Sequence, residues 1–274
     1  MATIIQSTVR LELLNGPLLS MCGIGKTFGA VRALSNVDFE VSSGEVVGLV
    51  GDNGAGKSTL IKTISGVSPC DEGEIIMNGQ AVKISNPQMA AHLGIETVYQ
   101  DLALCDNLDV VSNLFLGREV CTHVRTLSNL AMEQQALDVL RILDVKIPSI
   151  RAQVATLSGG QRQCIAVAKT ILRNAKVVLL DEPTAALGVA QTRQVLNLIL
   201  RLRAQGLAVV IISHNLADVF SVVDRVIVLR LGTRVGTFNV KTTTPERIIA
   251  AITGAELGEV SIKTAGELPG GQQI

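Results

Sequence analysis

Four short apolar runs constrain the fold of this chain more than any other feature of its sequence. They cover residues 46–50, 177–180, 208–212 and 226–229 and consist mostly of Val, Ile and Leu. Runs of this length are typical of strands buried on both faces, and helical patterns fall between them, as in a parallel sheet covered by helices. A membrane-spanning helix needs roughly 18 apolar residues, which none of the runs approaches. The sequence therefore predicts an α/β core.

Two other segments indicate helices. Residues 191–203 carry apolar side chains at helical spacing, and Gly206 follows where such a helix ends. Residues 102–157 also show a mostly helical sequence pattern, especially Leu130 to Leu143, and interrupt the strand pattern. We interpret this second segment as a helical insertion.

Residues 20–85 differ from the rest of the chain. Short β-prone pieces at 36–41 and 73–77 are accompanied by an Asn78-Gly79 pair, which favours a tight hairpin turn. These features predict a small antiparallel layer beside the parallel core.

Three parts are expected along the chain. They are an N-terminal extension at 1–17, one large domain at 18–254 with its helical insertion at about 102–165, and a flexible C-terminal tail at 255–274. Residues 261–274 are rich in Gly, Pro and Gln, which favours a frayed end. No positive cluster followed by an apolar stretch opens the chain, so we expect no signal peptide and a cytosolic location.

Composition excludes several classes of function. Lys and Arg total 24 against 24 Asp and Glu, so no basic excess is present to neutralise nucleic-acid phosphates. Aromatic residues are only 2%, which supplies few base-stacking rings. The five cysteines are odd in number, scattered and without a C-x-x-C pair, so reduced structural thiols are expected. A dedicated DNA or RNA binder is not expected.

A phosphate-binding loop follows the first apolar run. The stretch fits the G-x-x-x-x-G-K-[ST] pattern in the required strand-loop-helix context, whereas the alternative is a simple Gly-rich turn. Backbone N–H groups of such a loop surround phosphate oxygens, and the following helix contributes the positive end of its dipole. Lys57 is expected to reach the β- and γ-phosphates and Ser58 to bind Mg²⁺. The predicted nucleotide-binding residues here are Gly51, Asp52, Asn53, Gly54, Ala55, Gly56, Lys57, Ser58 and Thr59.

Two acidic residues end the second apolar run. Asp181 and Glu182 lie at the carboxyl end of a predicted core strand, where open α/β sheets bind ligands. We expect Asp181 to hold Mg²⁺ and Glu182 to polarise the attacking water. The alternative for this pair is an ordinary solvated strand end.

A Ser-Gly-Gly-Gln segment carries a more specific signal. Ser158 and Gln161 form a capping box at the start of a helix predicted over 161–173. Gly159 and Gly160 between them are poor helix formers, which weakens a purely structural explanation and favours backbone access to an anion. Together with the preceding Leu157, the segment gives the sequence Leu157-Ser158-Gly159-Gly160-Gln161, which resembles the signature of ATP-binding cassette (ABC) proteins.

The resemblance extends over about residues 18–254 and implies further roles. It implies that Gln100 links Mg²⁺ and water to a partner contact, that His214 contacts the γ-phosphate, and that Phe28 stacks on adenine. His92 and His123 match no family position and are expected on the surface. The implied fold is a P-loop NTPase of the RecA-like type: a parallel-sheet core with an antiparallel β subdomain and a helical insertion.

The sequences of three loops resemble those of one subfamily of ABC proteins. The stretches 101–108, 113–119 and 182–188 are similar to those of bacterial monosaccharide-importer ATPases. Gly188 stands where many ABC proteins carry an Asp, so the usual communication through that side chain is not expected. The chain holds a single set of motifs, so it is expected to pair with another chain.

The function implied is that of an ATP-hydrolysing transporter motor with ATP and Mg²⁺ as cofactors. Two cassettes, as a homodimer, would sandwich two nucleotides, each between the phosphate loop of one copy and residues Ser158 to Gln161 of the other. Implied partners are integral membrane permease subunits and an extracytoplasmic sugar-binding protein, with this chain peripheral at the cytoplasmic face of the inner membrane. The alternatives are an ABC ATPase of another class (exporter, lipid transport, or a soluble translation or repair factor) and a regulator that binds nucleotide without turnover.

Overall fold

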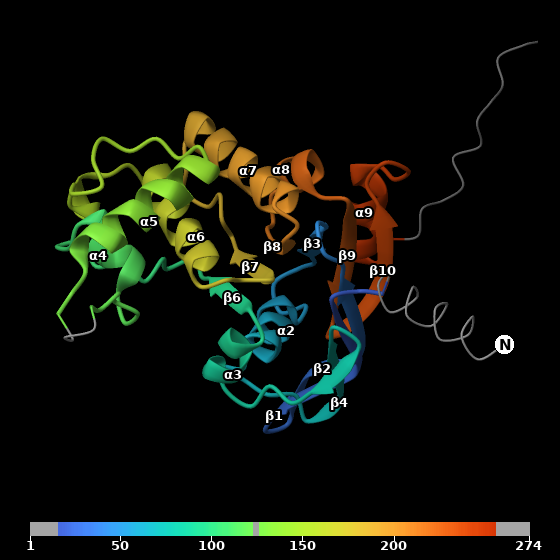
Figure 1. Cartoon of the computed structure of the whole chain (residues 1–274). Helices are drawn as coiled ribbons and strands as arrows, with labels where there is room; N and C mark the ends of the chain where they lie inside the picture. The colour runs from blue at the N-terminus through green and yellow to red at the C-terminus, as the bar shows by residue number, and fades with distance from the viewer. Residues whose placement is uncertain (1–15, 123–125, 256–274) are drawn as a thin grey trace, which may run out of the picture.

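A computed structural model describes residues 16–122 and 126–255 and contains two sheets, a six-stranded and a four-stranded one (Figure 1). Most of the expected N-terminal extension and tail, and His123, lie outside the described residues. Within the described part of the chain, no helix is long and apolar enough to cross a membrane.

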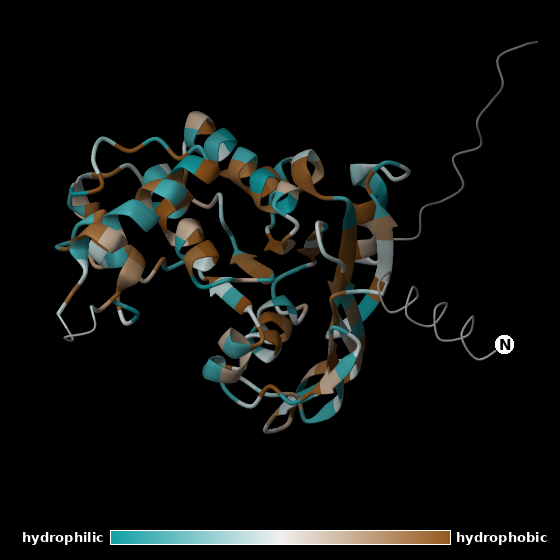
Figure 2. Ribbon diagram, in the orientation of Figure 1, coloured by the Kyte–Doolittle hydropathy of each residue, from teal (hydrophilic) through white to brown (hydrophobic). Residues whose placement is uncertain are grey.

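The six-stranded sheet forms the core, in the order β10-β9-β3-β8-β7-β6. Five strands run parallel, and β10 pairs antiparallel with β9 at one edge. The four predicted apolar strands are confirmed as β3, β7, β8 and β9, which are largely brown in the hydropathy colouring of Figure 2. The bounds are β3 (Val46–Val50), β6 (Ile95–Val98), β7 (Val177–Asp181), β8 (Ala208–Ile212), β9 (Arg225–Arg230) and β10 (Thr233–Asn239).

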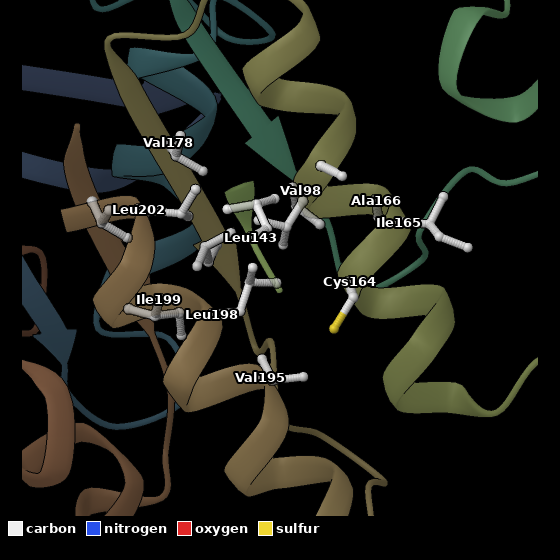
Figure 3. Packing of buried hydrophobic residues seen from close by; sticks show 14 of the residues in the cluster. Val98, Leu143, Cys164, Ile165, Ala166, Val178, Val195, Leu198, Ile199 and Leu202 are labelled. Carbon is white, nitrogen blue, oxygen red and sulfur yellow. The ribbon is translucent and has the colours of Figure 1, made fainter. Parts of the chain in front are cut away.

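Helices cover both faces of this sheet, as the strand pattern predicted. Side chains alternate along each strand, so that Val178 joins the hydrophobic cluster on one face and Leu179 the cluster on the other. Figure 3 shows part of the first cluster, in which Cys164 and Ile165 of α6 and Leu198 and Ile199 of α7 all take part. The helices are α2 (Lys57–Ile64), α3 (Pro87–His92), α4 (Val110–Phe115), α5 (Asn129–Ile142), α6 (Gly159–Leu172), α7 (Val189–Ala204), α8 (Leu216–Val222) and α9 (Pro245–Thr253), with a 3₁₀ turn η1 (Val154–Thr156).

The predicted antiparallel layer is the four-stranded sheet, in the order β2-β1-β4-β5. Asn78 and Gly79 join β4 to β5 with φ angles of 52° and 73°, the two left-handed positions of a two-residue hairpin. This sheet closes over α2 and the second face of the core (Figure 1). The bounds are β1 (Leu19–Phe28), β2 (Val31–Val41), β4 (Glu72–Met77) and β5 (Gln80–Val82).

The helical structure predicted for residues 102–157 is also present. The chain forms α4, α5 and η1 between β6 and α6, and the helix expected near 130–143 is α5. His92 is exposed, as predicted. Residues 102–157 therefore place a helical layer beside the edge of the core sheet formed by β6 (Figure 1).

Candidate functional site

The phosphate loop leaves the buried strand β3 and enters α2 at Lys57. Gly56 precedes the helix with φ 102°, and a Cβ there would lie 2.8 Å from Leu34 Cδ2 and 2.9 Å from the Ala33 carbonyl oxygen. A glycine is therefore required on both conformational and steric grounds. The loop is held against β2 at this point.

Lys57 lies inside the curve of the loop. Its Nζ donates to the carbonyl oxygens of Gly51 and Asp52 at 2.6 and 2.9 Å. Burial lowers the pKa of Lys57, and the nearby carboxylates of Glu182, Asp52 and Asp181 oppose that shift. The ammonium group is thus positioned by the loop's own backbone and stands beside Asp181, the predicted metal ligand, and Glu182, the predicted base.

The loop lines a cleft of about 580 Å³ together with predicted site residues that are distant from it in the sequence. Gln100, Asp181, Glu182 and His214 all line it. Such a hollow is large enough for a ligand of nucleotide size. Its other lining residues are Val31, Arg32, Ala33, Asn53, Gly54, Ala55, Gly56, Lys57, Ser58, Thr59, Ile212, Leu231 and Gly232.

The two acids stand together at the carboxyl end of β7. Asp181 ends β7, and burial together with the neighbouring charge of Glu182 raises its pKa. Glu182 adopts the left-handed conformation, φ 50°, while its N–H donates to the Ile212 carbonyl at 2.9 Å. Strained backbone of this kind collects at functional sites. Here it turns the chain away from β7 at the point where the Glu182 side chain enters the cleft.

His214 follows β8 and faces Glu182. Its Nδ1 lies 3.0 Å from Glu182 Oε2, while 79% of the histidine side chain is exposed. The contact fixes the carboxylate and leaves most of the imidazole open to a ligand. Neither of the two local sequences predicts that His214 pairs with Glu182.

The oxygen donors in the cleft fit Mg²⁺. Ser58, Gln100 and Asp181 offer hydroxyl, amide and carboxylate oxygens, the hard ligands that Mg²⁺ takes together with substrate phosphates and water. Burial, and after it the charge of Glu182, raises the pKa of Asp181, and a divalent cation bound beside these carboxylates would relieve both effects.

The Ser-Gly-Gly-Gln segment forms the predicted capping box. The Gln161 N–H donates to Ser158 Oγ at 3.3 Å, and the Ser158 N–H donates to Gln161 Oε1 at 3.0 Å. The helix predicted over 161–173 is wrong at its start, because α6 begins at Gly159. The capping box places both glycines inside the first turn, where an N–H needs no intrahelical partner.

Gly160 also has a packing role that the sequence did not reveal. A Cβ there would lie 2.9 Å from Gln191 Cβ of α7, whereas one at Gly159 would meet Leu187 Cδ2 at 3.1 Å. Helices α6 and α7 therefore approach closely at this glycine. Both the capping box and this contact give the segment a structural role of its own.

Several predicted residues lie apart from the cleft lining. Gly159 lines a separate hollow of about 380 Å³, together with Gln100 and Leu187, and Ser158, Gly160 and Gln161 line neither. Phe28 is half exposed, with Lys26 Nζ 5.5 Å from its ring centroid, and like Gly51 and Asp52 it is not part of the cleft lining. The cleft of one chain thus brings together the loop, Gln100, both acids and His214, without the signature segment.

Other lining residues were missed by sequence reasoning. Val31, Arg32 and Ala33 reach the cleft from β2, and Leu231 and Gly232 reach it from the turn between β9 and β10. They carry no motif, and only the tertiary arrangement of two hairpins brings them to the loop.

This chain is similar to several known proteins. A family model described as ABC transporter matches residues 34–185. The fructose import ATP-binding protein FrcA of Rhizobium meliloti is 47% identical over 88% of this chain and 95% of its own length. The xylose/arabinose import ATP-binding protein XylG of Sulfolobus acidocaldarius is 44% identical over 89% of this chain and 97% of its own.

Solved structures give the same result for the fold. One ATP-binding cassette of an ABC transporter, in its ADP conformation, superposes with a TM-score of 0.73 at 26% identity, covering 88% of this chain and 96% of that one. The fold described above is accordingly that of a P-loop ABC ATPase. The chain therefore belongs to the ABC transporter family and is one of its ATPases.

Proposed function

We propose that this protein is the motor subunit of a monosaccharide importer, hydrolysing ATP to drive transport through a separate membrane permease. The fructose and xylose/arabinose import proteins, similar over nearly their whole length, support the sugar class. The observation that carries the proposal is the single cleft in which the phosphate loop, two carboxylates, Gln100 and His214 converge. Residues 18–254 would form the ATP-binding domain, with the helical insertion at about 102–165.

Each side chain in the cleft has a distinct task in this proposal. Lys57 would leave its two backbone acceptors and bind the β- and γ-phosphate oxygens. Ser58, Asp181 and Gln100 would hold Mg²⁺, which neutralises charge on the phosphates when bound. Glu182 would accept a proton from the attacking water, and His214 would hold Glu182 in place and contact the γ-phosphate.

The signature segment would act on the nucleotide of a second copy. Ser158 is exposed at the start of α6, and it lies outside the cleft of its own chain. A helix N-terminus presents free N–H groups and the positive end of the helix dipole to an anion. A homodimer in which each segment faces the partner's phosphate loop uses these groups, and ATP would close the pair while hydrolysis reopens it.

Permease contact is proposed for the surface around residues 100–119. Gln100 lines both the cleft and the hollow that contains Leu102, Leu104 and Gly159. A change at the nucleotide therefore has a short path to this surface. The permease, with an extracytoplasmic sugar-binding protein, would supply all sugar recognition, and this chain would lie peripherally at the cytoplasmic face of the membrane.

Uptake of labelled monosaccharides tests the proposal. A strain lacking this gene should lose uptake of one sugar or a few from a panel, the wild-type gene should restore it, and Glu182→Gln should not. That variant keeps the shape of the site and removes the base, which contributes typically about 10²- to 10⁴-fold to rate. Unchanged uptake of every sugar after deletion, or full restoration by Glu182→Gln, would contradict the proposal. The purified protein should show no sugar binding by calorimetry.

A further inference from the structure

Leu231 has a conformation and an exposure that the fold alone does not explain. It is the first residue of the turn between β9 and β10, with φ 48°, and 78% of it is exposed. A bulky side chain in the left-handed region is an outlier, whereas Asn and Asp are enriched there. Leu231 therefore accepts an unfavourable backbone conformation without burying its side chain within the chain.

The turn that carries Leu231 is fixed against the phosphate loop. The Gly232 N–H donates to the Ala55 carbonyl at 3.1 Å, and the Ser35 N–H donates to the Gly232 carbonyl at 2.8 Å. A Cβ at Gly232 would lie 2.7 Å from the Ala33 carbonyl oxygen, so the two backbones touch. Leu231 is consequently held at the rim of the cleft, which it lines.

A second exposed aliphatic side chain lines the same cleft. Val31 begins β2, is 65% exposed, and pairs directly with Phe28 across the hairpin. Directly opposed residues of an antiparallel pair project to the same face of the sheet, so Phe28 and Val31 form one apolar surface. Arg32, the next residue, is held by Glu72 Oε2 at 2.6 Å.

We propose that Leu231 and Val31 form an aliphatic clamp for the nucleobase of the bound nucleotide, with Leu231 as its added positioning residue. The proposal rests on the cleft being the nucleotide site. The loop at 51–59 takes the phosphates, so the base, the apolar part of the ligand, lies toward the wall formed by β2 and the β9–β10 turn. Aliphatic side chains carry no donor or acceptor for the base edge, so the clamp binds adenine and guanine about equally.

Leu231→Asn tests the clamp without weakening the fold. Asn favours the left-handed conformation, so the melting temperature should stay the same or rise. Loss of the apolar contact should weaken ATP binding about five- to tenfold in calorimetry, and leave the affinity for inorganic tripolyphosphate, which has no base, unchanged. Leu130→Asn is the matched control, because Leu130 is 81% exposed on α5 and does not line the cleft, and it should leave ATP affinity unchanged.

Unchanged ATP affinity in Leu231→Asn, or an equal loss for tripolyphosphate, would overturn the clamp. A preference of wild type for ATP over GTP of more than about tenfold would also overturn it, because such a preference needs polar contacts to the base edge. Lys57→Ala distinguishes a failure of the clamp from a failure of the phosphate-loop assignment. It should lose both ligands, and retention of ATP by that variant would show that the phosphate-loop assignment itself has failed.

Discussion

Replacing Gly160 with Ala tests whether the close approach of α6 and α7 depends on this glycine. The added Cβ would lie 2.9 Å from Cβ and 3.4 Å from Cα of Gln191. These atoms move only with the backbone of α7, so relief requires a shift of the helix. An extra methyl group in a packed contact costs about 1–3 kcal/mol, and the gain in helix propensity offsets about 1 kcal/mol of that. We expect Gly160→Ala to lower the free energy of unfolding by about 1 kcal/mol.

Gly159→Ala is the matched comparison in the same turn. Its Cβ would meet Leu187 Cδ2 at 3.1 Å, which is the far end of a flexible side chain. The propensity gain should therefore dominate, and the variant should be neutral or stabilised by up to about 1 kcal/mol. Because about 1 kcal/mol shifts the melting temperature by about 2–4 °C at this size, Gly160→Ala should melt roughly 3–6 °C below Gly159→Ala in calorimetry. Equal melting temperatures, or a more stable Gly160→Ala, would refute the packing argument.

Three further changes have defined outcomes. Lys57→Ala should weaken ATP binding about 10- to 150-fold in calorimetry, as expected for the loss of charge-assisted hydrogen bonds to phosphate, and retained affinity would contradict its role. Gly188→Asp should fit without strain, because no atom lies within 4 Å of a Cβ at this N-cap of α7. It should raise the free energy of unfolding by about a few tenths of a kcal/mol in urea denaturation, and a clear loss of stability would contradict this. Burial raises the pKa of the Cys164 thiol to about 12 from an ordinary 9.0, although Arg201 acts in the opposite sense. The unfolded chain therefore loses this proton first, so stability should fall between about pH 9 and pH 12 more steeply in wild type than in Cys164→Ala; parallel pH profiles would contradict the assignment.

The core strands and the phosphate loop were predictable because each is continuous in the sequence. β3 and β8 are unbroken apolar runs, and the loop follows β3 without a gap. β6 was not predicted, since Glu96 and Thr97 interrupt its four residues. β10 is an exposed edge strand with little apolar signal. Burial on both faces, and not strand structure itself, is what the apolar pattern detects.

The candidate site was predictable only where a motif marks it. Asp181 and Glu182 end a core strand, so their place at the cleft followed from the strand prediction. Leu231 belongs to a turn about 180 residues from the loop it contacts through Gly232, and no local pattern marks that contact. The fit of Gly160 against Gln191 likewise depends on two helices packing after they form. Contacts between distant segments are set by packing, which a single sequence does not display.

In the proposed dimer one ATP site needs two chains, and mixing two inactive variants tests this requirement. Lys57→Ala keeps the signature segment and loses the phosphate loop, whereas Ser158→Arg keeps the loop and blocks the segment by bulk. Each variant alone should be nearly inactive as an ATPase. Random pairing makes about half of the dimers mixed, and each mixed dimer holds one intact site, so about a quarter of all sites should be competent.

The measurement is the ATPase rate of the mixture at equal concentrations, after a melting curve shows that both variants are folded. Activity should appear on mixing and approach about a quarter of the wild-type rate. A mixture as inactive as its two components, or full activity in Ser158→Arg alone, would contradict the shared site.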